Sequence, residues 1–320
     1  MNIINVGGWY VGNSAILDWM GGVKEIAVIK GDFNIVRLEN GIMDMISEQD
    51  KEKKLLMITY QQKQSYKGFY WASRMLIGRY TKRLFEKKTI PSYYGHFKFH
   101  KIFLKYLKEY KDKVILGEPF DEVVFWQSWL NTLPSLSSEK NNFEHIVYQN
   151  PFFYDTTYDG HSDIWPNLFG PYKMIFVHRD PLDQFSDIVN GNAHLDASWP
   201  RFHGDTKDMD PAERFLTISK KIFQARLEMA DKHTENELII LSFEDFLQKH
   251  ELVTSKLCTF LNLNPATLNC SSNFDLSKSL KNVGVGKNNL KALSLLEGKD
   301  YILDELYSLR EQLKSHDRSI

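Results

Sequence analysis

Residues 3–20 read IINVGGWYVGNSAILDWM: a short apolar run, a loop with glycines, and an apolar segment with helical spacing. A strand that turns through glycines into a helix aims several backbone N–H groups at one point. The helix dipole adds partial positive charge at that point. The segment therefore predicts a site for a phosphate or sulfate group. A tight turn without a ligand is the alternative interpretation of the same glycines.

Five short apolar runs predict the strands of one parallel sheet. Most are nearly continuous in Ile and Val, which is typical of strands covered by helices on both faces. Helical segments separate them, so we expect an α/β fold with a doubly wound parallel sheet of about five strands. In such sheets ligands bind beyond the carboxyl ends of the strands, where the first loop lies. The runs are Ile3–Val6, Glu25–Ile29, His145–Tyr148, Lys173–His178 and Leu238–Leu241.

The interval between the second and third runs predicts a long helical insertion, over about residues 52–140. It contains three helix-like segments rich in aromatic residues, Tyr66–Lys87, Phe97–Tyr110 and Pro119–Leu133. We expect the insertion to lie over the edge of the sheet where the ligand binds. No linker rich in Pro, Gly or Ser marks a second domain, so residues 1–320 are expected to form a single domain.

The second half of the chain predicts three further helices, one of them starting after Ser242, and one irregular stretch. Pro211–Asn236 begins with a proline at a helix start and continues amphipathically. Ser242 has capping-box spacing to Asp245. Asn262–Lys291 has little periodicity and is expected to be loop, and a final helix is expected at Tyr301–Lys314.

Composition excludes several classes of protein. The net charge is −1, so no overall positive field attracts nucleic acid or an anionic membrane. Two cysteines, Cys258 and Cys270, cannot form a disulfide framework, and no Cys/His cluster has zinc spacing. No apolar run is long enough to span a bilayer, and no signal-peptide pattern opens the chain. We expect a cytoplasmic protein without a metal; a membrane-bound partner and the oligomeric state stay open.

The first loop has the spacing of the nucleotide-binding pattern G-x-x-x-x-G-K-S/T, but Asn13 replaces the lysine. A nucleoside triphosphate site without that lysine would lack the cation that binds the β- and γ-phosphates. A phosphoryl-transfer enzyme of this type is therefore the weakest of the functions considered. An anion loop for another nucleotide fits the residues better.

A second anion site is predicted at the carboxyl end of the fourth strand, where Arg179 stands. Pro181 presets the first turn of the following helix. Ser186 and Asp187 lie about two turns into that helix and are expected to face back toward Arg179. The alternative is that Arg179 only forms an ion pair with Asp180 or Asp183.

These segments resemble motifs of the sulfotransferase family. Residues 177–181, VHRDP, resemble its V-R-D-P strand end, which with a downstream serine binds the 3′-phosphate of 3′-phosphoadenosine 5′-phosphosulfate (PAPS). Residues 8–17 resemble its 5′-phosphosulfate loop. Residues 241–246 with 257–263 resemble its Y-E-D-L and I-C-x-F-L-G-L segment, and residues 281–287 resemble the late loop that closes over the nucleotide.

The resemblance implies transfer of a sulfuryl group from PAPS to a hydroxyl, leaving the desulfated nucleotide PAP. A bacterial carbohydrate-type member with a glycan acceptor is the expected case, without nucleic acid or metal. The positions that match the family's nucleotide-binding motifs are Gly8, Tyr10, Val11, Gly12, Asn13, Ser14, Ala15, Arg179, Ser186, Asp187, Lys281, Asn282, Gly284 and Lys287.

Three departures from the family pattern favour an alternative function. Tyr10 stands where the first loop usually carries a basic residue. Ser186 follows Arg179 by seven positions instead of eight, and Asp187 takes the eighth. Residues 149–151, QNP, replace a K-T-P segment. A catalytically impaired nucleotide-binding module of the same fold is therefore the second hypothesis.

Sulfuryl transfer needs donors at the sulfuryl oxygens and a base at the acceptor hydroxyl. We assign the donors to the backbone of residues 12–14 and to the Asn13 and Ser14 side chains. Asp32, just past the second strand, is the first candidate base; the alternative is that Asp32 only caps or turns the chain after Gly31. His161 is the second candidate. Lys30, Lys281 and Lys287 are candidates for the missing positive charge.

Overall fold

A computed structural model describes residues 1–7, 11–29, 34–37, 40–82, 91–136, 143–149, 164–191, 209–264 and 274–316. Five strands form one sheet in the order β2-β3-β1-β4-β5, and all neighbours pair in parallel. The predicted doubly wound α/β fold is confirmed, and each predicted strand end is displaced by at most one residue. The strands are β1 (Asn2–Gly7), β2 (Ile26–Ile29), β3 (His145–Gln149), β4 (Tyr172–His178) and β5 (Leu238–Ser242).

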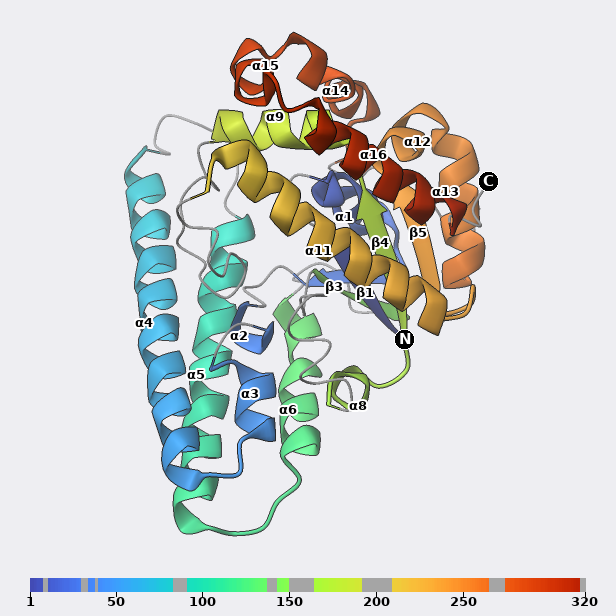
Figure 1. Cartoon of the computed structure of the whole chain (residues 1–320). Coiled ribbons are helices and arrows are strands. Elements are labelled where there is room, and N and C mark those ends of the chain that lie inside the picture. Colours follow the sequence, from blue (N-terminus) through green and yellow to red (C-terminus); the bar gives the residue numbers. More distant parts are fainter. Residues whose placement is uncertain are drawn as a thin grey trace.

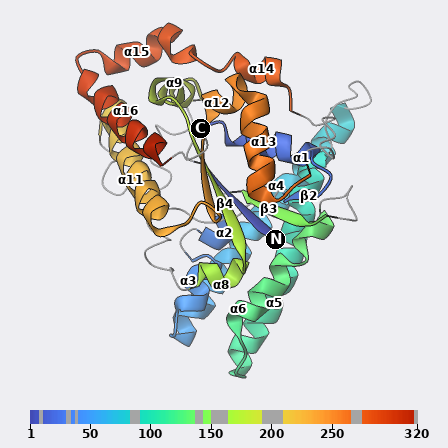
Figure 2. The same ribbon diagram turned by 90° about the vertical axis from the view of Figure 1, so that its right-hand side faces the viewer.

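One face of the sheet is covered by α1 (Asn13–Gly22), α12 (Phe243–Gln248) and α13 (His250–Leu261). Successive strand residues point to opposite faces, so Ile3 and Ile175 enter this layer. Figure 2 shows α1 and α13 on one side of the strands and α11 and α16 on the other.

The opposite face is covered by α9 (Pro181–Gly191), α11 (Pro211–Lys232) and α16 (Asp300–Ser315). Ile4 and Phe176, which follow Ile3 and Ile175 in the chain, belong to this core. In Figure 1, α11 and α16 cross in front of the strands. The two cores explain why the strands are apolar on both faces.

The chain leaves β1 and β4 toward opposite faces of the sheet. These strands are neighbours, with Gly7 opposite Val177. The connection after β1 enters α1, whereas the connection after β4 enters α9 and α11. The two connections part above the carboxyl ends of β1 and β4, which is where ligands bind in open α/β sheets.

A long helical insertion separates β2 from β3, as predicted, and forms the lower left part of the molecule in Figure 1. It packs against the face of the sheet that carries Ile4, because Phe99, Phe103, Trp126 and Trp129 fill the core there. Packing against this face does not test whether the insertion also lies over the carboxyl edge, which stays a prediction. Its elements are α2 (Asn34–Arg37), α3 (Ile42–Ser47), α4 (Lys51–Lys82), α5 (Pro91–Leu116), α6 (Glu122–Leu130) and the 3₁₀ turn η1 (Leu133–Leu136).

Helix α4 begins well before the predicted start at Tyr66, since Asp50 accepts hydrogen bonds from the backbone of Glu52 and Lys53 and so caps its first turn. Although α4 has 32 residues, no helix of the described ranges is long and apolar enough to cross a bilayer.

The stretch expected to be loop contains two short helical elements, α14 (Leu276–Leu280) and the 3₁₀ turn η4 (Val285–Asn288). The carboxylate of Asp275 caps α14 by accepting the N–H of Lys278. Such side-chain caps stabilise a single turn without any apolar period, which is why periodicity missed them. The remaining elements are α8 (Trp165–Phe169), between β3 and β4, and α15 (Leu290–Leu296), before α16.

Candidate functional site

The loop after β1 enters α1 through Gly12, whose φ of 85° is left-handed. A Cβ at this position would lie 2.0 Å from Cδ2 of Phe243. Backbone conformation and packing therefore both require glycine here. Val11 and Asn13 are buried, Ala15 is partly buried and Ser14 is exposed at the start of the helix. The N-terminus of a ten-residue helix thus faces the carboxyl edge of the sheet, as an anion loop needs.

Arg179 follows directly after β4 and is only 3% exposed. Its Nη1 donates to Asp187 Oδ2 at 2.5 Å, and its Nη2 donates to the carbonyl of Asn282 at 2.6 Å. Its Cζ lies 5.2 Å from the centre of the Phe243 ring. The same phenyl ring thus touches both Arg179 and the Gly12 turn, so the structure brings the two predicted anion segments together.

The late loop, residues 281–287, packs on the first turn of α9. Asp183 accepts the backbone N–H groups of Gly284 at 2.7 Å and Gly286 at 2.8 Å. A Cβ at Gly286 would lie 2.7 Å from the backbone of Leu182, so this approach requires glycine. The side chains of Lys281 and Lys287 are exposed. The loop therefore closes over α9 beside Arg179.

Ser186 and Asp187 have different surroundings. Ser186 is buried, and its hydroxyl accepts a hydrogen bond from Asn289 Nδ2 at 2.6 Å. Asp187 is the residue that reaches Arg179. The alternative pairing of Arg179 with Asp180 or Asp183 is not what the structure shows, because Asp183 binds the late loop instead.

A buried ionic network holds the turn that carries Arg179. Glu244 accepts the backbone N–H of Asp180 at 2.8 Å and forms an ion pair with Arg310 of α16. Arg310 also donates from Nε to His178 Nδ1 at 3.2 Å and lies 3.7 Å from Asp180 Oδ2. Tyr307 donates its hydroxyl hydrogen to Asp180. The C-terminal helix therefore fixes the end of β4.

His178 is held neutral by this arrangement. Arginine has no acceptor, so Nδ1 of His178 accepts from Arg310 and the imidazole proton is on Nε2. Burial, reinforced by the charges of Arg310, Arg226 and Lys314, lowers the pKa of His178 well below its ordinary value of 6.5. Protonation of His178 would place a further positive charge beside Arg310.

We expect stability to decrease as the pH falls below about 6.5, because the unfolded chain then binds a proton that folded His178 does not. The slope for one such site approaches about 1.4 kcal/mol per pH unit. Urea unfolding at pH 7.5 and at more acidic pH measures it. His178→Asn keeps an acceptor for Arg310 and should have a shallower slope. His145, whose pKa burial also lowers, titrates in both proteins and cancels in the comparison. Equal slopes would contradict the assignment.

Three residues beside this site were not predicted to belong to it. Phe243 lies against both Gly12 and Arg179, Asp183 binds the late loop, and Arg226 of α11 lines a cavity of about 10 Å³ together with Val11 and Arg179. The motif around Glu244 marked the segment that contains Phe243. No sequence pattern pointed to Asp183 or Arg226, because each acts through contacts between distant segments.

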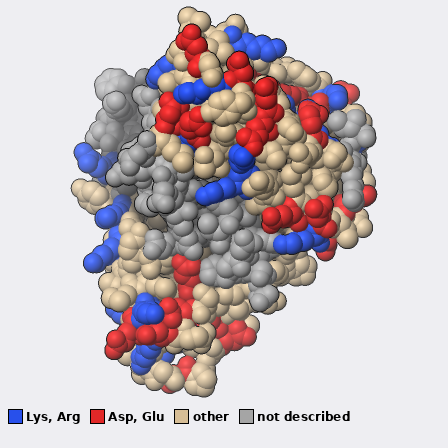
Figure 3. All heavy atoms as spheres, viewed as in Figure 1, with Lys and Arg blue, Asp and Glu red and all other residues tan. Residues whose placement is uncertain are grey.

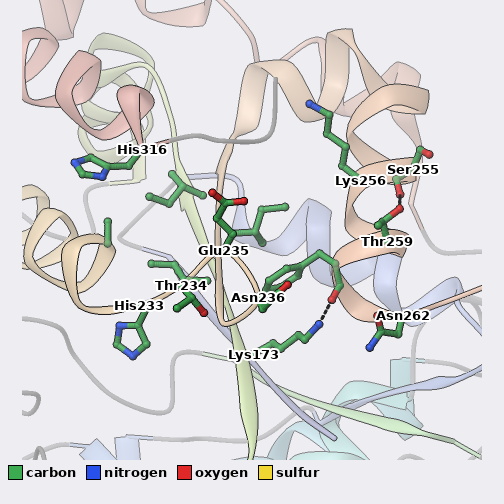
Figure 4. Close-up of a pocket in the computed structure, with 15 residues that line it drawn as sticks. Lys173, His233, Thr234, Glu235, Asn236, Ser255, Lys256, Thr259, Asn262 and His316 are labelled. Atoms are coloured by element: carbon green, nitrogen blue, oxygen red, sulfur yellow. Dashed lines mark hydrogen bonds between the residues drawn. The ribbon is translucent and has the colours of Figure 1, made fainter.

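A second cavity, of about 370 Å³, opens at the opposite edge of the sheet. Lys173, near the start of β4, lines this cavity. Arg179 lies six residues further along, which is about 20 Å from Lys173 along an extended strand. Figure 4 shows the Lys173 ammonium directed at the carbonyl of Phe260, to which it donates a hydrogen bond. Lys173 therefore satisfies the C-terminal end of α13. This cavity is separate from the Gly12–Arg179 site.

Several predicted residues lie outside the described part of the chain: Gly8, Tyr10, Lys30, Asp32 and His161. The two candidate bases and the position of the missing basic residue are therefore predictions. Among the described residues, no three His, Cys, Asp or Glu side chains are grouped so as to hold a metal ion. Cys258 is buried, and burial raises the pKa of its thiol.

No family model and no curated protein sequence matches the chain. Among solved structures it is similar to the sulfotransferase domain from the curacin biosynthetic pathway, at 15% identity and a TM-score of 0.44, over 98% of this chain and 97% of that one. It is also similar to the sulfotransferase domain from the Synechococcus PCC 7002 olefin synthase, at 12% identity and a TM-score of 0.41, over 100% and 93%. Sulfotransferase STF9 from Mycobacterium avium has 10% identity and a TM-score of 0.40, over 95% and 76%. Values this low assign no activity.

Proposed function

We propose that the chain is a PAPS-dependent sulfotransferase that acts in the cytoplasm on a hydroxyl acceptor, with a glycan as the expected acceptor. One observation carries the proposal. The Gly12 turn at the N-terminus of α1 and the guanidinium of Arg179 both lie against one phenyl ring, that of Phe243, at the sheet edge where ligands bind. Two anion-binding groups at one edge suit a nucleotide that has phosphates at both ends.

The described residues fit such a nucleotide in three places. The first turn of α1, from Gly12 to Ser14, would hold the 5′-phosphosulfate through backbone N–H groups. Arg179 would hold the 3′-phosphate. The late loop, bonded to Asp183 through Gly284 and Gly286, would lie over the nucleotide. PAPS supplies an activated sulfuryl group, and the chain's part is to position and neutralise it.

Asp187 complicates the 3′-phosphate site. Its carboxylate is 2.5 Å from Arg179 Nη1, so a phosphate has to displace it or bind beside a negative charge. This ion pair is the specific observation in favour of the second hypothesis, a nucleotide-binding module with impaired catalysis. The two functions differ in turnover and not in affinity for PAP.

In the proposed reaction a base would take the acceptor proton, the acceptor oxygen would form a bond to the sulfur, and the bond from the sulfur to the 5′-phosphate oxygen would break to release PAP. Asp32 is our first candidate for this base, and His161 is the second candidate. The backbone N–H groups and side chains of Asn13 and Ser14 would donate to the sulfuryl oxygens. Leaving as a phosphate, PAP needs little proton donation, so catalysis depends on charge stabilisation and alignment.

Titration of the protein with PAP in a calorimeter tests the proposal. We expect Arg179→Ala to weaken PAP binding by about tenfold or more, because it removes a charge-assisted hydrogen bond worth about 1.5–3 kcal/mol. Asp187→Asn should strengthen binding, because it removes a negative charge from the phosphate site. Asp32→Asn should leave PAP affinity unchanged and abolish sulfuryl transfer from PAPS to a glycan library.

The outcomes separate the hypotheses. Absence of PAP binding at tens of micromolar would overturn the proposal of a nucleotide site. PAP binding without transfer to any acceptor would favour the impaired module. Equal loss of PAP affinity in Arg179→Ala and Asp32→Asn would contradict the assignment of binding to one residue and proton removal to the other.

A further inference from the structure

The helical hairpin of α4 and α5 has a charge opposite to that of the rest of the chain. Residues 51–116 contain 17 lysines and arginines and only 4 aspartates and glutamates. All other residues together contain 23 basic and 37 acidic side chains. The overall charge of −1 therefore conceals a strongly positive arm on a negative body. Burial of the arm's apolar core does not require this excess.

Six exposed residues of α4 form one narrow line; Tyr66 and the first-turn residues 51–53 are exposed as well but are not counted in it. Residues that follow each other by steps of 4, 3, 4, 3 and 4 stay within about 40° of a common line on a helix, and this line is about 27 Å long. Leu56 is 70% exposed, and Tyr60 and Tyr70 are 43% and 68% exposed. The outer stripe, as we name it, consists of Leu56, Tyr60, Lys63, Lys67, Tyr70 and Arg74, all exposed.

The opposite side of α4 is the one that stabilises the fold. Ile58, Gln61 and Ser65 are buried there. Gly68 lies so close to α5 that a Cβ would be 2.4 Å from His100 Nε2. The inner face packs against α5, so the outer stripe has no part in holding the hairpin together. Its aromatic and basic residues need another explanation.

The six residues of the outer stripe include no acidic side chain; Glu52, four positions before Leu56, is the exposed acidic residue that continues the line at the start of the helix. Its basic members make no ion pair with any acidic side chain of the described ranges. Figure 3 shows blue side chains without red ones along the middle of the left edge, where α4 lies in Figure 1. Tyrosine and arginine together are the residues that contribute most to protein interfaces.

We propose that the outer stripe of α4 docks an acidic helix of a partner protein. The stripe follows the 3–4 spacing of a coiled-coil seam, which a second helix can match along its whole length. Leu56, Tyr60 and Tyr70 supply apolar contacts, and Lys63, Lys67 and Arg74 select carboxylates on the partner. This inference is independent of the proposed sulfotransferase activity.

Other occupants fit the stripe less well. A second copy that used the same stripe would place lysine and arginine against lysine and arginine, which is repulsive. A bilayer surface favours a helix with a broad apolar face, whereas this stripe is narrow and contains a single leucine. A long polyanion such as nucleic acid would extend beyond the arm and meet the acidic body of the molecule.

Fluorescence anisotropy with the full-length protein tests the proposal. The probe is a labelled synthetic helix that carries leucine along one seam and glutamate beside it. We expect the double variant Lys63→Glu/Lys67→Glu to bind this helix at least about tenfold more weakly than the unmodified protein, because two attractive pairs become repulsive. The matched control is Lys105→Glu/Lys108→Glu, which makes the same change of charge at exposed positions of α5.

The control should lose less than about twofold in affinity, and a scrambled peptide of the same composition, which has no seam, should bind more weakly. Equal losses in the two variants, or equal binding of the scrambled peptide, would reduce the effect to net charge and overturn the proposal. Binding of phosphatidylglycerol vesicles or of oligothymidylate that depends on Lys63 and Lys67, without binding of the helix, would overturn it in favour of those partners. Concentration-dependent self-association lost in the same variant would assign the stripe to a second copy.

Discussion

Gly12→Ala is expected to lower the free energy of unfolding by about 2–5 kcal/mol. At the φ of 85° observed for Gly12, an alanine is strained by about 1–2 kcal/mol. Its Cβ would also lie 2.0 Å from Cδ2 of Phe243, a ring that is only 2% exposed. Overpacking of this kind costs about 1–3 kcal/mol. The shift of the urea midpoint at constant slope measures the sum.

Gly298→Ala separates the two causes. Gly298 has a similar φ of 71°, but a Cβ there would meet nothing within 4 Å. This variant should show the backbone strain alone, about 1–2 kcal/mol. If Gly12→Ala were no more destabilising than Gly298→Ala, the contact with Phe243 would not be a tight one.

The Gly12 variant also has a consequence for the proposed site. Arg179 lies over the Phe243 ring, so a ring displaced by a Cβ at Gly12 moves the guanidinium as well. We therefore expect Gly12→Ala to weaken PAP binding even at temperatures where the protein remains folded. Gly298→Ala should leave PAP affinity unchanged.

The sheet was predictable from the sequence because its signal is local. Each strand is a short run of Ile and Val between turns, and both faces are buried, so hydrophobicity alone marks its ends. Helix α11 begins at Pro211 and Ser242 accepts the N–H of Asp245, both as predicted. The start of α4 was missed because its buried face includes the polar residues Gln61 and Ser65 while Leu56 is exposed, so no apolar period marks this part of the helix.

The candidate site was predictable only in part, because half of it depends on contacts between distant segments. Glycines before a helix and an arginine after a strand are visible as motifs, and their convergence followed from the expected fold. The pairing of Arg179 with Asp187 depends on the pitch of α9, which brings position 187 back over the end of β4. The bonds of Asp183 to Gly284 and Gly286 join residues about a hundred positions apart and have no local pattern.

Arg310→Met should destabilise the protein by about 2–4 kcal/mol. The substitution keeps the apolar stem of the side chain and removes the cation that Glu244 and Asp180 share. The side chains of Arg310 and Glu244 are only 8% and 15% exposed. Removing one partner of a buried ion pair costs about 3–5 kcal/mol, because a charge stays behind in a medium of low polarity. The hydroxyl of Ser242 and the N–H of Asp180 still donate to Glu244, which reduces the loss.

The control variant removes a different ion pair of α16, one that joins this helix to α11. Lys220 of α11 pairs with Glu305 of α16, but these side chains are 36% and 40% exposed, so Lys220→Met should cost less than about 1 kcal/mol. Glu244→Gln combined with Arg310→Met should recover part of the loss, because a neutral amide needs no cation, and the double-mutant cycle gives the coupling. Additive effects would show that the two side chains do not interact across the end of β4. A large coupling energy would show that α16 clamps the turn that presents Arg179, so PAP affinity should decrease in Arg310→Met and stay unchanged in Lys220→Met.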